Sequence, residues 1–95
     1  MARINADTLV RLTPLCERLR GVPGLMEIKP GIFYVKRIPM LHFHERDSDI
    51  VADLKCVSPK VAGFDRFAIC TARDRQVLVA ETAARCRFLL EKQTR

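Results

Sequence analysis

The sequence predicts an α+β fold: an antiparallel meander sheet of four to five strands, with an N-terminal and a long C-terminal helix packed on one face. Apolar residues recur at three- and four-residue steps near both chain ends, which is typical of helices. Between residues 25 and 56 they alternate with polar residues, which is typical of strands. Ninety-five residues are too few for two domains, so residues 1–95 are expected to form one.

The first element is expected over residues 5–20. Its helical stripe consists of Leu9, Leu12, Cys16 and Leu19. Pro14 leaves two alternatives: a short lead-in turn followed by a helix that Thr13 caps, or one kinked helix. Gly21, Pro23 and Gly24 then end the element.

Four short strand-like runs follow, with turn residues between them. The runs are LMEIK, IFYVKR, MLHFHER and IVADLKC, separated by Pro30-Gly31, Ile38-Pro39 and Asp47-Ser48-Asp49. Connections this short join antiparallel neighbours, because a parallel return needs a crossover of a dozen or more residues. A fifth strand is expected at RFAIC, after the loop at residues 57–65.

The last helix is expected over residues 71–95, where Thr71 and Asp74 resemble a capping box. It carries two apolar stripes on nearly opposite sides. One is Val79, Ala83, Cys86 and Leu90, and the other is Val77, Ala80, Ala84 and Phe88. The second stripe needs a cover, for which the first helix and a partner subunit are the alternatives.

Alternation along the strands divides their side chains between two faces. The face expected to meet the helices carries Phe33, Val35, Leu41, Phe43, Ile50, Ala52 and Leu54. The open face carries Tyr34, Lys36, His42, His44, Val51, Asp53 and Lys55.

The strand register follows from the turns. A two-residue turn at Asp47-Ser48 sets His42 opposite Asp53, and His44 opposite Val51. A three-residue link at residues 37–39 sets Tyr34 opposite His42. Both registers keep the apolar residues on one face.

A small-ligand site on the open face is therefore the main hypothesis. The candidate binding residues are Tyr34, His42, His44 and Asp53. Asp53 would orient one ring nitrogen of His42, and the other nitrogen would exchange a proton with Tyr34 or a ligand. Ordinary solvated polar residues are the alternative, so no catalytic residue is assigned and enzyme activity is left open.

A metal site on the same face is a second hypothesis. His42 and His44, two positions apart on a strand, could reach one ion together with Asp53, whereas Glu45 points to the other face. Two histidines and one carboxylate are too little to predict a metal, so neither a metal nor a cofactor is expected.

The net charge of +6 raises nucleic acid as a partner. The basic residues are mixed with acids along the chain, and Glu81 and Glu91 interrupt those of the last helix: Arg73, Arg75, Arg85, Arg87, Lys92 and Arg95. The alternative function is thus a nucleic-acid or protein interaction module, with a homodimer as one form. Nucleic acid is the less favoured partner, and no membrane is expected.

The four cysteines indicate the compartment. Cys16, Cys56, Cys70 and Cys86 show no paired spacing, so free thiols in a reducing cytoplasm are expected. The amino terminus lacks a secretion pattern and the chain has no apolar run long enough for a membrane, which favours the same location. Only Cys56, beside Lys55, suggests a reactive thiol.

Three segments, VPGLMEIKPGIFYVK, LHFHERDSDIVADLK and GFDRFAICTARDRQ, resemble a family of short bacterial proteins of unknown function. The resemblance covers about residues 22 to 76, and its most specific parts are LHFHE and ADLK. More distantly, the chain is similar to bacterial "luciferase domain" proteins and to YjbR-like double-wing proteins. These resemblances imply an α+β fold in a bacterial cytoplasm, and no activity.

Overall fold

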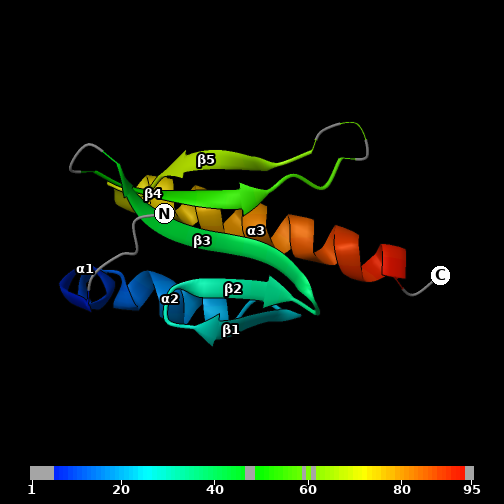
Figure 1. Cartoon of the computed structure of the whole chain (residues 1–95), viewed down its shortest axis with the longest axis horizontal. Coiled ribbons are helices and arrows are strands. Elements are labelled where there is room, and N and C mark those ends of the chain that lie inside the picture. The colour runs from blue at the N-terminus through cyan, green and yellow to red at the C-terminus, as the bar shows by residue number, and fades with distance from the viewer. Residues whose placement is uncertain (1–5, 47–48, 59, 61, 94–95) are drawn as a thin grey trace.

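The computed structural model describes residues 6–46, 49–58, 60 and 62–93. Its sheet has five antiparallel strands in the order of the chain, which confirms the meander (Figure 1). The elements are α1 (Ala6–Arg11), α2 (Thr13–Arg20), β1 (Leu25–Lys29), β2 (Ile32–Val35), β3 (Ile38–Arg46), β4 (Asp49–Lys55), β5 (Phe64–Ala68) and α3 (Ala72–Gln93).

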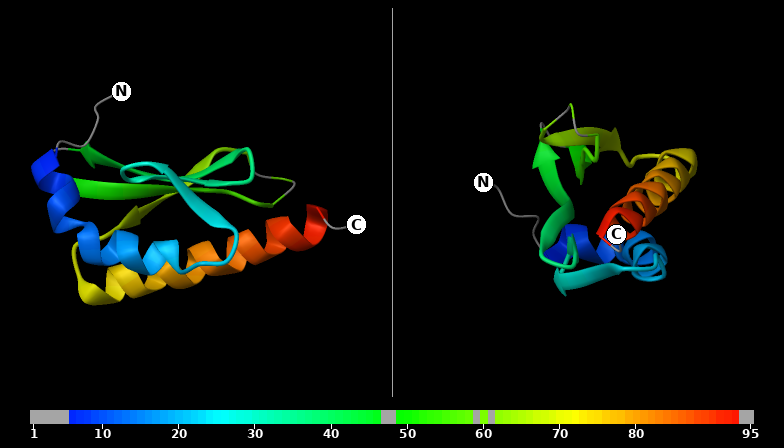
Figure 2. Two further views of the ribbon diagram at one scale, coloured as in Figure 1. Left: turned by 90° about the horizontal axis from the view of Figure 1, so that it is seen from below. Right: turned by 90° about the vertical axis from the view of Figure 1, so that its right-hand side faces the viewer.

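The helices form a second layer on one side of the sheet, as Figure 2 shows for α2 and α3. The predicted inner face is confirmed: Phe33, Val35, Leu41, Phe43, Ala52 and Leu54 are buried, and Ile50 packs against them. Leu12, Cys16 and Leu19 of the N-terminal stripe are buried as well. The α+β fold with helices on one face is therefore confirmed, and no described element covers the other face.

The N-terminal helix is divided at Leu12, where φ is −93° and ψ is 0°. Pro14 lies in the first turn of α2, a position where the missing N–H of proline costs nothing. Leu12 is the N-cap, and the Thr13 hydroxyl instead donates a hydrogen bond back to the Leu9 carbonyl at 3.4 Å. The lead-in segment predicted before Pro14 is thus a helical piece of its own, and the expected Thr13 cap is wrong.

The turn between β2 and β3 differs from the prediction. It lies at Lys36 and Arg37, with Lys36 in the left-handed region at φ 55°, and β3 already begins at Ile38. A β-bulge then shifts the register, so that Tyr34 pairs with Pro39, and Ile32 pairs with His42. The predicted pairing of Tyr34 with His42 is therefore wrong.

The bulge has a physical cause in the core. Met40 is the extra residue of β3, and both Met40 and Leu41 are almost fully buried. Two consecutive side chains can face the core only where the alternation of the strand is interrupted. Pro39 lies beside the bulge, one of the places where a strand tolerates a residue without an N–H.

The register of β3 and β4 agrees with the prediction. His42 pairs with Asp53, and His44 pairs with Val51. The turn predicted at residues 47–48 lies outside the described residues. β5 begins at Phe64, two residues before the expected start, and ends at Ala68. Its pairing with β4 places Arg66 opposite Asp53.

The predicted capping box of α3 is confirmed. The amide of Asp74 donates to the Thr71 hydroxyl at 3.0 Å, and the amide of Thr71 donates to the Asp74 carboxylate at 3.1 Å. These bonds satisfy two backbone groups around the start of the helix.

The buried side of α3 centres on Leu78, Thr82, Cys86 and Leu89. On the opposite side, Val77 and Phe88 are exposed, so the first helix does not cover the second stripe as one alternative proposed. A partner subunit on this stripe stays a prediction. Among the described helices, none has the length and apolar character that crossing a membrane requires.

Candidate functional site

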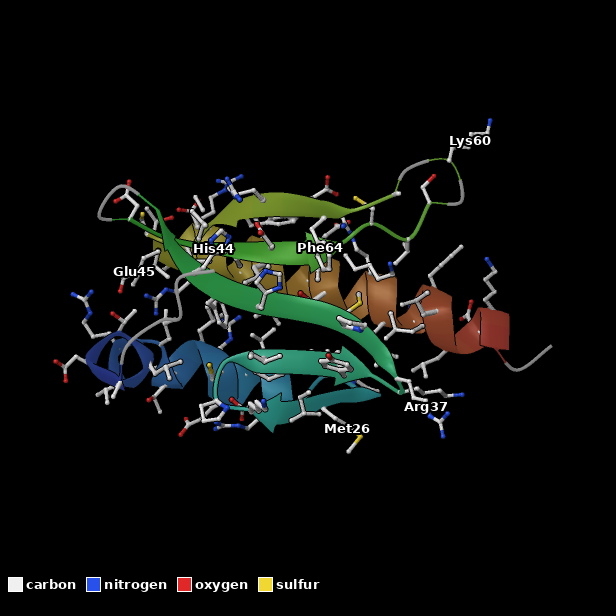
Figure 3. The ribbon with its side chains drawn as sticks, viewed as in Figure 1. Met26, Arg37, His44, Glu45, Lys60 and Phe64 are labelled. Carbon is white, nitrogen blue, oxygen red and sulfur yellow. The ribbon has the colours of Figure 1, made fainter. Side chains whose placement is uncertain are left out.

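The centre of the open face is a row of side chains across neighbouring strands. Pairing places Ile32, His42, Asp53 and Arg66 side by side on β2, β3, β4 and β5. His44 follows two residues after His42 on the same strand and therefore shares its face. Figure 3 looks onto this face and labels His44 and, at the start of β5, Phe64.

Asp53 is the common partner of both histidines. Its Oδ2 lies 2.8 Å from Nε2 of His44 and 3.6 Å from Nε2 of His42. An ionised carboxylate only accepts hydrogen bonds, so the short contact requires a proton on Nε2 of His44. Asp53 thus orients His44 rather than His42, which changes the predicted assignment while keeping the predicted residues together.

Arg66 completes the cluster. Its Nε donates to the other carboxylate oxygen of Asp53, Oδ1, at 3.2 Å. The side chain of Asp53 is 15% exposed, and Arg66 and His44 supply the polar partners that a partly buried carboxylate requires. Arg66 is the first residue of the expected fifth strand, but the long loop before that strand leaves its register with β4 open, so the pairing of Arg66 with Asp53 was not predicted.

Phe64 forms the wall of the site beside His42. Its ring meets the His42 ring edge-on at 5.4 Å between centroids, and the Lys55 ammonium lies 6.0 Å from the Phe64 centroid. The ring of His42 is in turn 5.6 Å from that of His44. The histidines therefore lie between an apolar ring and a carboxylate.

A groove of about 780 Å³ adjoins the cluster, and residues of both faces of the sheet line it. The part of its lining that the open face supplies is Ile32, Tyr34, Pro39, His42, His44 and Phe64. Tyr34, predicted as a neighbour of His42, thus belongs to the wall of the same groove although it lies outside the row of His42 and Asp53. The apolar surface continues past the groove at Met26 and Ile28 of β1, both at least half exposed.

Glu45 lies apart from the cluster, as predicted. Its carboxylate accepts a hydrogen bond from the Thr8 hydroxyl of α1 at 3.0 Å. It therefore tethers the first helix to β3 instead of contributing to the open face.

Three side chains of the cluster are close enough together to bind one metal ion. His42, His44 and Asp53 each offer a ligand atom, and these atoms lie within 4.8 Å of one another. Within the described residues, this is the single group of three such side chains close enough to hold an ion.

A second polar cluster lies around Arg85 of α3. Its guanidinium contacts Asp65 at 2.8 Å and Glu81 at 3.0 Å, and donates to the Lys55 carbonyl at 2.9 Å. Partial burial and the neighbouring Asp65 carboxylate raise the pKa of the Cys56 thiol. A reactive Cys56 is therefore not favoured, because nucleophilic cysteines need a lowered pKa.

Several basic side chains are committed to contacts inside the domain. Arg85 is paired with acids, Arg75 donates to the Ile69 carbonyl, and Arg20 pairs with Glu27. These side chains offer less to a polyanion than the net charge suggests.

Comparison of the chain with protein-family models, with curated proteins and with solved structures found no match. The resemblance of its motifs to short bacterial proteins therefore stays a prediction.

Proposed function

We propose that this domain binds a small amphipathic ligand on the open face of its sheet. The apolar part of the ligand would lie in the groove along Ile32, Tyr34 and Pro39, and its polar group would meet the histidines. The observation that carries the proposal is the adjacency of the groove to the His42, His44, Asp53 and Arg66 cluster.

The apolar part of the proposal is supported by exposed side chains. Met26, Ile28, Ile32 and Phe64 are large apolar residues that the described chain leaves exposed on this face. Contiguous exposed apolar surface beside polar groups is typical of ligand and partner sites. Covering Ile32 and Phe64 would remove apolar surface from water, which stabilises a complex by about 25 cal/mol per Å².

The polar end favours a ligand with a hydrogen-bonding or anionic group. Arg66 and Lys55 are cations at this end, and His42 is partly exposed beside the groove. Because Asp53 already offsets the charge of Arg66, a single anionic group suits the site better than a highly charged one. A polyanion such as nucleic acid, the alternative partner, has less support here.

A cytoplasmic location remains part of the proposal. All four cysteines are free thiols. Cys16 lies in α2, Cys56 follows β4, Cys70 precedes α3 and Cys86 lies within α3. Free thiols are typical of a reducing compartment.

The test uses the fluorescent probe anilinonaphthalene sulfonate, which joins an apolar body to one anionic group. We expect saturable binding that Ile32→Asp weakens by on the order of tenfold, since about 1.4 kcal/mol of apolar contact corresponds to that factor. The matched control is Val77→Asp, which places the same charge on the exposed side of α3.

Two outcomes would contradict the proposal. One is equal weakening by Ile32→Asp and Val77→Asp, which would indicate nonspecific adsorption. The other is binding that leaves the NMR signals of His42 and Phe64 unchanged, since both residues line the groove.

A further inference from the structure

The structure points to a divalent transition-metal site of the zinc class, and we propose that His42, His44 and Asp53 are its ligands. This inference goes beyond the proposed ligand groove, because it rests on three donor atoms and not on the apolar lining. It would hold even if the groove bound nothing.

The donor set suits the metal. Imidazole nitrogen and carboxylate oxygen are ligands of zinc at about 2.0 to 2.2 Å, and two histidines with one carboxylate recur in sites that keep a position open. A tetrahedral ion at such bond lengths has its ligand atoms about 3.4 Å apart. The observed separations bracket that value: 2.8 Å from Asp53 to His44, 3.6 Å from Asp53 to His42, and none above 4.8 Å.

The backbone brings these donors together before any ion arrives. His42 and His44 are two residues apart on β3, and Asp53 pairs directly with His42 on β4. Both strands lie in the interior of the sheet, with a neighbour on each side. Binding would therefore require side-chain adjustments only, which is the preorganisation that a metal site needs.

An ion at this site would have to displace the hydrogen bond between His44 and Asp53. Nε2 of His44 lies 2.8 Å from Oδ2 of Asp53 and donates the proton of that hydrogen bond to the ionised carboxylate. Histidine binds metals as the neutral ring through an unprotonated nitrogen, so the proton of His44 would move to Nδ1 and the ion would occupy its place at Nε2.

Arg66 would act as the outer partner of the carboxylate. It holds Oδ1 of Asp53 at 3.2 Å and leaves Oδ2 directed at the two rings. Metal-binding carboxylates are commonly oriented by hydrogen bonds of this kind. The positive charge of Arg66, 3.5 Å from Nε2 of His44 at its Nη2, counts against the ion and weakens the site relative to a neutral setting.

The experiment is calorimetric titration of the full chain with zinc ion alone, paired with NMR of the two histidine rings. We expect one ion per chain and simultaneous shifts of both rings. His44→Ala and Asp53→Asn should each weaken binding by on the order of 10- to 100-fold or more, since loss of an outer-sphere partner already costs that much.

Glu45→Gln is the matched control. It removes one negative charge from β3 next to His44, but Glu45 faces Thr8 on the other side of the sheet. We expect zinc affinity to stay within about twofold of the parent protein, as for a distant surface charge.

The cysteines are the competing ligands, because Cys56 and Cys70 are accessible enough to bind zinc. Cobalt ion distinguishes them: a thiolate charge-transfer band would place the ion on cysteine and overturn the proposal. Stoichiometric zinc binding that survives unchanged in both His44→Ala and Asp53→Asn would overturn it too, as would the absence of zinc binding to the folded parent protein.

Failure of the proposed ligand groove and failure of the zinc site give different results, because one is measured by probe binding and the other by zinc binding. Ile32→Ala should weaken the fluorescent probe and leave zinc affinity unchanged, because alanine adds no ligand atom beside His42. Asp53→Asn should move the joint ring shift to zinc concentrations on the order of 10- to 100-fold higher.

Discussion

At the scale of single residues, Thr82 is an exception in the core. It is fully buried on α3, and its hydroxyl has no hydrogen-bond partner among the described residues. A buried polar group without a partner costs about 1 to 3 kcal/mol. We expect Thr82→Val, which keeps the shape, to raise the free energy of unfolding by roughly 1 kcal/mol in urea denaturation.

The control for Thr82 is Thr82→Ala, which also removes the hydroxyl but leaves a cavity. It should be less stable than Thr82→Val. A valine variant less stable than the parent protein would show that the hydroxyl does have a stabilising partner in solution.

Gly31 is constrained both by its backbone and by its surroundings. Its φ is 78°, and an added Cβ would lie 2.9 Å from Cδ2 of Leu9. Gly31→Ala should therefore lower the free energy of unfolding by about 1 to 3 kcal/mol, measured by chemical denaturation.

Gly63 offers a matched control for Gly31. Its φ of 94° is also positive, but an added Cβ would have no neighbour within 4 Å among the described residues. Gly63→Ala should cost less than Gly31→Ala, and the difference measures the clash with Leu9. Equal costs would mean that Leu9 moves aside without penalty.

At the scale of elements, Glu27 ties the first hairpin to α2. Its carboxylate accepts a hydrogen bond from Nε of Arg20 at 2.6 Å and another from the Gly31 amide at 3.0 Å. Burial acts to raise the pKa of Glu27, but these two bonds outweigh it and hold the pKa below its usual value of 4.5.

The lowered pKa of Glu27 gives a prediction for stability against pH. The stabilising contribution of the ionised carboxylate is fully present above about 4.5, the pKa of the unfolded chain, and is lost as the pH falls through the lower folded value. Glu27→Gln should be less stable than the parent protein at neutral pH, by roughly 1 to 2 kcal/mol. In denaturation at a series of pH values, the gap should narrow in acid; a constant gap would contradict the assignment.

The elements also show what the sequence could predict about the site. Alternation of apolar residues in β3 and β4 determines a single register, because a shift by one residue would expose the core. The pairing of His42 with Asp53 followed from that alone. The alternation therefore predicted this half of the candidate site.

Tyr34 could not be placed in the same way, because the bulge at Met40 is not visible in the residue pattern. Pro39 suggested a turn, and the real turn at Lys36 and Arg37 contains none of the usual turn residues. The bulge forms because Met40 is buried, and its burial depends on the assembled core and not on the local residue pattern. The contact of Arg66 with Asp53 could not be predicted either, because the loop at residues 57–65 leaves the register of the fifth strand open.

At the scale of the whole molecule, stability should be highest where the sheet is paired on both sides. β3 and β4 are interior strands and carry the core residues Phe43, Ala52 and Leu54, while β1 and β5 are edges. We expect the slowest amide hydrogen exchange in β3 and β4, measured by NMR, because exchange there requires global opening. Faster exchange in β4 than in β5 would contradict this order.

The meander has a further consequence for the order in which the protein folds. Each strand pairs with the one that precedes it in the chain, so most of the sheet forms from contacts between near neighbours in sequence. Contacts of this kind close small loops and favour rapid folding. His42, His44 and Asp53 belong to one hairpin, so their cluster would assemble when that hairpin closes, before the two ends of the chain meet as α2 and α3.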